Sequence, residues 1–222
     1  MKRKGDTKMA IETPKATCLL CKSRYSGMGM TRHLQSCLPK SLKDQRNQKK
    51  GKDKPFFHIL VKGYDLPEYW LHLKVDANAE LDDLDQFLRN IWLECCGHMS
   101  AFSYGRDELE MERKLKEVLR PGMELLHEYD FGSTTTLLVK VLSEYEGQLE
   151  KDNPVQILAR NEAPEIVCDE CEKALAVQIC TECQWNGSGW LCEACAKDHE
   201  CGEEMLLPVV NSPRTGVCGY TG

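Results

Sequence analysis

Hydrophobic and polar positions alternate with a period of two just after residue 55. Phe57, Ile59 and Val61 are separated by single residues, a spacing that places them on one face of a β-strand. A turn at residues 65–68 follows, and residues 69–75 are expected to return as a second strand. Four later segments are also expected to be strands: 99–104, 124–129, 134–143 and 155–159.

Between the second and third of these strands the pattern changes to a helical period. Asn78 is placed to cap a helix that runs to about residue 94. The apolar positions expected to form its buried stripe are Leu81, Leu84, Leu88, Ile91 and Trp92. Strands around one main helix predict an α+β fold, a β-grasp-like roll of about five or six strands, flanked by two small zinc-binding modules.

Cysteine spacing near the end of the chain indicates one of these modules. Three Cys-x-x-Cys pairs recur every twelve residues: Cys168/Cys171, Cys180/Cys183 and Cys192/Cys195. A two-residue gap lets both thiolates of a pair reach one tetrahedral metal, and several such pairs together are a strong signature of zinc. The candidates to complete a second tetrahedron downstream are His199, Cys201 and Cys218.

Two ligation patterns fit this spacing. In the interleaved pattern, which we prefer, the first and third pairs hold one zinc ion, and Cys180 and Cys183 hold another with two of the three downstream ligands. In the sequential pattern, the first two pairs share a zinc ion. Trp185, Trp190 and Leu191 are expected to pack around the metals because so short a segment has little other core. The alternative is an exposed Trp185 that anchors a partner.

A second metal module is predicted near the start of the chain. Its candidate ligands are Cys18, Cys21, His33 and Cys37. A Cys pair followed by a His/Cys pair at i, i+4 resembles the C2H2-type zinc finger, although the inner loop is one residue short and the last ligand is Cys. Tyr25, Met30 and Leu34 are expected to form the small core of this finger. The complete chain is thus expected to bind about three zinc ions.

Charge is divided sharply along the chain. The net charge is −6, but residues 1–54 hold 15 Lys and Arg against four acids, a net charge of +11. The rest of the chain carries −17. We therefore expect nucleic acid to contact residues 1–54, and a protein partner to bind the acidic central and C-terminal regions. The alternative is that the basic residues are only solvated, in which case the chain is a protein–protein adaptor.

The central segment resembles a known family. The matching residues include Leu66-Pro67, Trp70, the segment Gly97-His98-Met99-Ser100-Ala101-Phe102 and, most specifically, Glu128-Tyr129-Asp130-Phe131-Gly132. On these residues, positions 55–164 resemble the plasmid pRiA4b ORF-3-like family. The resemblance implies the fold and a link to plasmids or transposable elements, but no established activity. The chain departs from the family pattern at Ser133-Thr134-Thr135-Thr136, where a Trp and a His are usual.

The sequence contains few signs of catalysis. His58, His72, His98 and His127 are candidate acid–base groups, and His98 beside Asp130 would suggest a metal-dependent hydrolase. However, the sequence has no nucleophile elbow, phosphate-binding Gly loop or HExxH motif, so we expect a non-enzymatic protein. Cys95-Cys96 are expected to end the helix as small apolar residues.

The expected organisation follows from these patterns. It comprises a basic tail at 1–16, a zinc finger at 17–40, a basic linker at 41–54, the α+β domain at 55–164 and a Cys-rich zinc module at 165–222. Because no apolar run of membrane-spanning length or signal sequence is found, we expect a cytoplasmic protein that does not contact membranes. Reduced cysteines on metal fit that compartment.

Overall fold

A seven-stranded antiparallel sheet forms the centre of the computed structural model, which describes residues 14–46, 52–150 and 153–222. In spatial order its strands are β6 (Asp107–Leu109), β5 (Ser100–Tyr104), β7 (Glu124–Tyr129), β8 (Thr135–Gly147), β3 (Lys54–Gly63), β4 (Trp70–Asp76) and β9 (Val155–Arg160). The predicted α+β class is confirmed, but the sheet has one strand more than the six segments expected. The additional strand is β6, a polar three-residue edge strand without the alternation that marks a half-buried strand.

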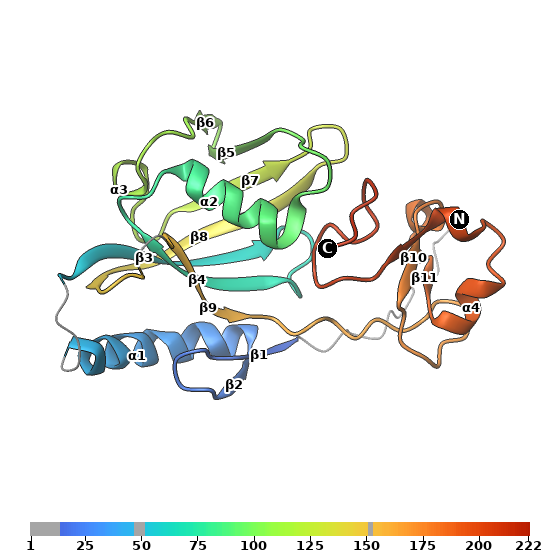
Figure 1. Cartoon of the computed structure of the whole chain (residues 1–222), viewed down its shortest axis with the longest axis horizontal. Helices are drawn as coiled ribbons and strands as arrows, with labels where there is room; N and C mark the ends of the chain where they lie inside the picture. Colours follow the sequence, from blue (N-terminus) through green and yellow to red (C-terminus); the bar gives the residue numbers. More distant parts are fainter. Residues whose placement is uncertain (1–13, 47–51, 151–152) are drawn as a thin grey trace, which may run out of the picture.

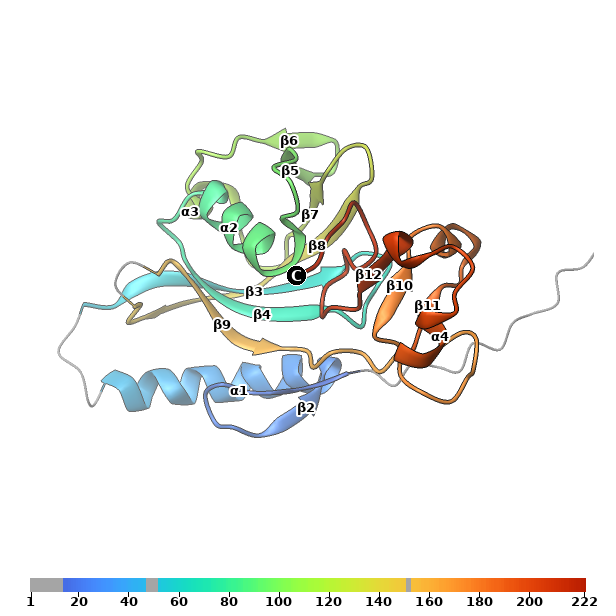
Figure 2. The same cartoon turned by 45° about the vertical axis from the view of Figure 1, so that its right-hand side comes forward.

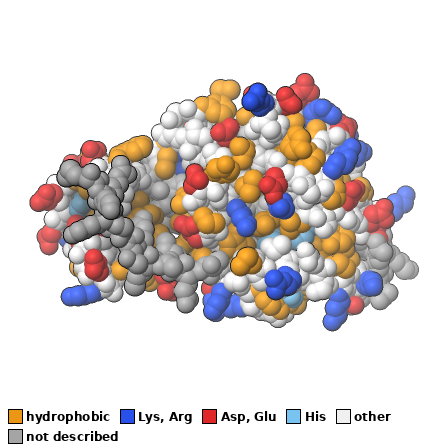
Figure 3. All heavy atoms as spheres, turned by 180° about the vertical axis from the view of Figure 1, so that it is seen from behind, with side chains coloured by type: hydrophobic (Ala, Val, Ile, Leu, Met, Phe, Trp, Pro, Cys, Tyr) orange, Lys and Arg blue, Asp and Glu red, His pale blue; other side chains and the backbone are white. Residues whose placement is uncertain are grey.

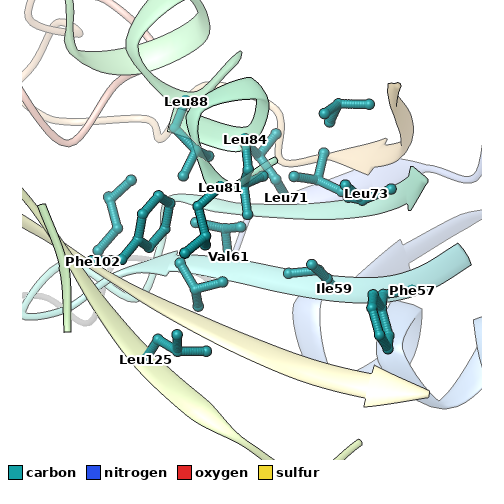
Figure 4. Packing of buried hydrophobic residues seen from close by; sticks show 14 of the residues in the cluster. Phe57, Ile59, Val61, Leu71, Leu73, Leu81, Leu84, Leu88, Phe102 and Leu125 are labelled. Atoms are coloured by element: carbon teal, nitrogen blue, oxygen red, sulfur yellow. The ribbon is translucent and has the colours of Figure 1, made fainter. Parts of the chain in front are cut away.

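Helix α2 (Leu81–Leu88) covers one face of this sheet (Figure 1) and continues into a π-helical turn, Arg89–Leu93. Its apolar stripe packs on the inward side chains of β3 and β4, as Figure 4 shows for Leu84, Leu88 and Val61. The short helix α3 (Leu115–Val118) adds Leu115 to the same core. The predicted helix is therefore present in this position.

The predicted cap of that helix is wrong. The N-cap residue is Glu80, whose backbone N–H donates to the Asp83 side chain at 2.8 Å in a capping box. Asn78 lies just before it, where its backbone N–H donates to the Asp76 carboxylate. Asn78 therefore takes part in this turn and does not cap the helix.

Helix α1 (Gly27–Arg46) covers the opposite face of the sheet, so the molecule has three layers (Figures 1 and 2). The hairpin of β1 (Lys15–Thr17) and β2 (Arg24–Ser26) precedes it. Every fourth residue along α1 is buried: Met30, Leu34, Leu38 and Leu42. These side chains share one apolar cluster with Phe56, Leu60 and Trp70 of the sheet. Hence the finger helix and the sheet bury a common core.

Two histidines are enclosed in this second interface. His58 Nε2 lies 2.9 Å from His72 Nδ1, and His72 Nε2 lies 3.2 Å from the Thr31 hydroxyl on α1. Burial lowers the pKa of His58 to about 4 and that of His72 well below its usual value. Both rings are therefore neutral at physiological pH and link α1 to the sheet.

The C-terminal Cys-rich module (residues 165–208) contains a small three-stranded sheet in the order β11-β10-β12. Its elements are β10 (Gln178–Cys180), the 3-10 helix Cys183–Asn186, β11 (Trp190–Leu191), α4 (Glu193–Lys197), the 3-10 turn Glu203–Met205 and β12 (Leu206–Pro208).

Across the parts of the chain that the structure describes, no helix is sufficiently long and apolar to span a membrane.

The C-terminal tail (residues 209–222) runs from this module back to the central sheet, between α2 and the module (Figure 1). The Ser212 hydroxyl donates to the Trp92 carbonyl at 2.5 Å. Arg214 is fully buried, and its guanidinium donates to Asp130 at 2.7 Å and to Thr135 at 2.9 Å. These charge-assisted bonds hold the tail on the central domain.

Candidate metal centres

The finger brings its four predicted ligands together. Cys18 Sγ lies 4.0 Å from Cys37 Sγ, and Cys21 Sγ lies 3.2 Å from His33 Nε2. The Tyr25 ring stacks on His33 with centroids 4.2 Å apart, which fixes the imidazole plane. The backbone N–H of Ser23 donates to Cys21 and lowers the pKa of that thiol to about 6, which favours the thiolate that zinc requires.

The first C-terminal group joins Cys168, Cys171, Cys192 and Cys195. Cys171 Sγ and Cys192 Sγ are 3.8 Å apart, so the first and third pairs meet, as in the interleaved pattern. The backbone N–H groups of Ala174 and Lys173 donate to Cys171 and lower its thiol pKa to about 6. Such a tight chain turn around the sulfur is typical of zinc knuckles.

The second C-terminal group contains Cys180, Cys183, His199 and Cys201. Cys183 Sγ lies 3.5 Å from His199 Nε2 and 3.7 Å from Cys201 Sγ. His199 Nδ1 contacts the Glu170 carboxylate at 2.9 Å, an interaction that orients the ring toward a metal. Glu170 lies between Cys168 and Cys171 of the first group. This contact therefore links a ligand of the second group to the chain turn that carries the first.

A fourth group lies where the tail meets the central domain, and sequence reasoning missed it. It consists of Cys95, Cys96, His98 and Cys218. His98 Nε2 lies 3.0 Å from Cys96 Sγ and 3.2 Å from Cys218 Sγ. Cys218 thus lies away from the second C-terminal group, where it was a candidate, and Cys95-Cys96 are not merely apolar residues at a helix end. The sequence did contain one sign of this group. His199, Cys201 and Cys218 were three candidates for two ligand positions, so one of them had to lie elsewhere.

Each of the four groups could hold a zinc ion, one more than the three predicted. Within each group, all ligand atoms lie within 4.8 Å of one another. Three groups offer three sulfurs and one imidazole nitrogen, and the group at Cys168 offers four sulfurs. Four protein ligands fill a tetrahedral zinc site, which is characteristic of a structural metal.

We therefore expect purified protein to contain four zinc ions per chain, since four complete ligand sets are present. After replacement by ¹¹³Cd, the NMR spectrum should contain one resonance from a four-sulfur site and three from sites with one nitrogen. Elemental analysis of the same sample gives the total. A count of three, with one nitrogen-containing resonance missing, would contradict a fourth occupied site.

The remaining histidines differ in their surroundings. His58 and His72 are enclosed under α1, and His127 Nε2 contacts Asp85 at 2.6 Å in the core. His98 does lie near Asp130, at 3.5 Å. The Asp130 carboxylate, however, accepts a hydrogen bond from Arg214, which lowers the pKa of Asp130 to about 2. The same Nε2 atom of His98 faces the two sulfurs of the fourth group.

Comparison with known proteins does not assign the chain to a family. No protein-family model matches it, and no curated protein matches it. Among solved structures, it is similar to the protein of unknown function MM3350 from Methanosarcina mazei Go1, with 15% identity and a TM-score of 0.41. The match covers 51% of this chain and 70% of the other. The likeness is distant and carries no functional information, so the resemblance to the plasmid pRiA4b ORF-3-like family stays a prediction.

Proposed function

We propose that this is a non-enzymatic zinc-binding protein whose basic N-terminal finger contacts nucleic acid and whose acidic regions bind a protein partner. The observation that carries the proposal is the charge on the outer surface of the finger. Across the described residues 14–46, the exposed Lys and Arg side chains are Lys15, Lys22, Arg24, Arg32, Lys40 and Lys43. The only acid in that part of the chain is Asp44, and Arg24 pairs with Glu162 from outside it.

The packing of α1 determines which surface is available. Figure 3 shows Lys and Arg side chains along the lower edge of the molecule, where α1 lies. One face of the helix start is covered: a Cβ on Gly27 would lie 3.1 Å from the Trp70 ring, and Thr31 contacts His72. Only the opposite face, with the exposed Met28 and Arg32, is free to approach a groove. Contact between the outer basic face and phosphates requires no rearrangement, so we propose binding without base specificity.

Salt dependence tests this proposal. Binding to duplex DNA should weaken with salt, and a Lys40→Gln/Lys43→Gln variant should lower the slope of log K against log salt by about 0.9 for each phosphate that the protein no longer neutralises. Both side chains are exposed, so the fold is unaffected. The matched control is Lys197→Gln, an exposed lysine on α4 of the acidic module. Absence of binding to all nucleic acids at low salt would favour the adaptor, whereas DNA binding that is unchanged in the double variant would contradict contact through the outer face of α1.

The adaptor role is supported by Trp185. The expectation that this residue packs around the metals is wrong, because its side chain is 79% exposed. Leu175 and Val177 of the same module are 50% and 49% exposed. An exposed aromatic ring on a module of acidic composition suits a protein partner rather than a polyanion, because large aromatic side chains often anchor interfaces.

A further inference from the structure

The fourth metal group differs from the other three in its exposure. In each of the other groups at least one cysteine is buried: Cys18 in the finger, Cys168 and Cys192 in the first C-terminal group, and Cys180 in the second. In the fourth group, Cys96 and Cys218 are exposed, and Cys95 and His98 are only half-buried. A competing ligand from solution can therefore reach this group without prior unfolding.

The fourth group also lacks the knuckle geometry. Backbone N–H groups surround Cys21 and Cys171 in their knuckles, whereas Cys95 and Cys96 are adjacent in sequence, with sulfurs 3.5 Å apart. The contacts of Cys95 Sγ are with side chains: the Arg214 guanidinium donates to it at 3.5 Å, and the Tyr129 hydroxyl lies 3.9 Å away. Outer contacts of this kind orient ligands, and side chains that can move hold a ligand less rigidly than the backbone of a knuckle does.

Cys218 reaches the group from a strained turn in the tail. Its φ is +50°, in the left-handed region that a cysteine rarely adopts, and Gly216 and Gly219 beside it are also at positive φ. A bound metal would supply a reason for this conformation. The same turn lines a pocket of about 410 Å³ together with Ser133 of the central domain and Gln184 and Trp185 of the zinc module.

We propose that Cys95, Cys96, His98 and Cys218 bind a fourth zinc ion that exchanges with solution faster than the other three. This ion fastens the end of the tail to the central domain across 122 residues of sequence. Its ligand set, three sulfurs and one imidazole, suits zinc and other soft divalent ions. Arg214 and the buried Tyr220 hold the tail on either side of Cys218, so release of this ion frees the Cys218 side chain and leaves the sheet folded.

Zinc release to a chromogenic chelator, 4-(2-pyridylazo)resorcinol, tests the proposal on the full-length protein. We expect wild-type protein to release one equivalent about 10- to 100-fold faster than the other three, by analogy with sites that lose outer contacts. Cys218→Ser should contain three zinc ions and lack the fast phase. Since Trp185 lines the same pocket, the fast phase should change tryptophan fluorescence in wild type and not in Trp185→Phe.

Matched variants separate this effect from general damage. Cys96→Ser should behave as Cys218→Ser does, because both sulfurs are exposed and belong to the same group. Val217→Ser changes the neighbouring position, keeps all four ligands and should retain the fast equivalent. Four ions in Cys218→Ser, three ions in wild type, or a single release phase for all four ions would each overturn the proposal.

Discussion

Cys171→Ser is expected to remove both zinc ions of the C-terminal module and to unfold residues 165–208. The core of this module consists mainly of the ligands themselves, and its buried apolar residues beyond cysteine are Ile179, Leu191 and Ala196. A core of that size cannot offset the conformational entropy of folding without metal. A structural zinc ion contributes on the order of 10 kcal/mol to such small domains, so the loss is expected to be complete.

Both ions should be lost, although Cys171 belongs to one group only. The two groups share a single small cluster, and Glu170 of the first knuckle holds His199 of the second. The seven-stranded sheet should remain folded because its two apolar clusters have no residue in common with the module. Metal analysis combined with ¹H–¹⁵N correlation spectra measures both effects.

The control is Ser188→Ala, an exposed serine on a turn of the same module, which should retain all four ions. A Cys171→Ser protein with four ions would contradict the assignment of this ligand. Loss of the sheet signals together with those of the module would show that the tail and module are required for the central domain.

Local patterns in the sequence were sufficient for much of the architecture. Strand β3 was predicted from alternation, β4 as its return after a turn, and α2 from its apolar stripe, because each of these signals lies within a few residues. The position of α1 was not predicted. The spacing of Met30, Leu34, Leu38 and Leu42 defines an apolar face but does not say which surface covers it. Phe56 and Leu60 lie on the face of β3 that is turned away from α2. Their apolar character indicated that this second face of the sheet is also covered.

The same distinction applies to the metal ligands. Each Cys-x-x-Cys pair is a local chelate, so the finger and C-terminal ligands could be selected from spacing alone. The fourth group joins Cys218 to Cys96 and His98, which precede it by 122 and 120 positions in the sequence. Only the return of the tail, held by Ser212 and Arg214, brings them together. No periodic pattern encodes that contact.

Deletion of residues 1–46 is expected to destabilise the central sheet severely. The deletion would expose Phe56, Leu60, Trp70 and Leu158, which are buried beneath α1 and the finger hairpin. At about 1.5–3 kcal/mol for each of these four side chains, the cost is roughly 6 to 12 kcal/mol as an upper estimate. That is comparable to the whole stability of an ordinary domain. Urea denaturation followed by circular dichroism should show little folded protein in the fragment 47–222.

A point substitution in the full chain provides the graded test of the same interface. Leu34→Ala should lower the free energy of unfolding by about 2–5 kcal/mol, because this side chain is fully buried against the sheet. Gln35→Ala, at the neighbouring exposed position, should change it by less than about 0.5 kcal/mol. If the fragment 47–222 unfolds with the stability of the full chain, the finger does not contribute to the core of the sheet. If deletion of residues 1–46 unfolds the sheet as expected, loss of DNA binding in the fragment 47–222 would not identify the binding surface, because the whole fold is lost. The Lys40→Gln/Lys43→Gln variant, which leaves the fold intact, is therefore the decisive measurement of DNA binding.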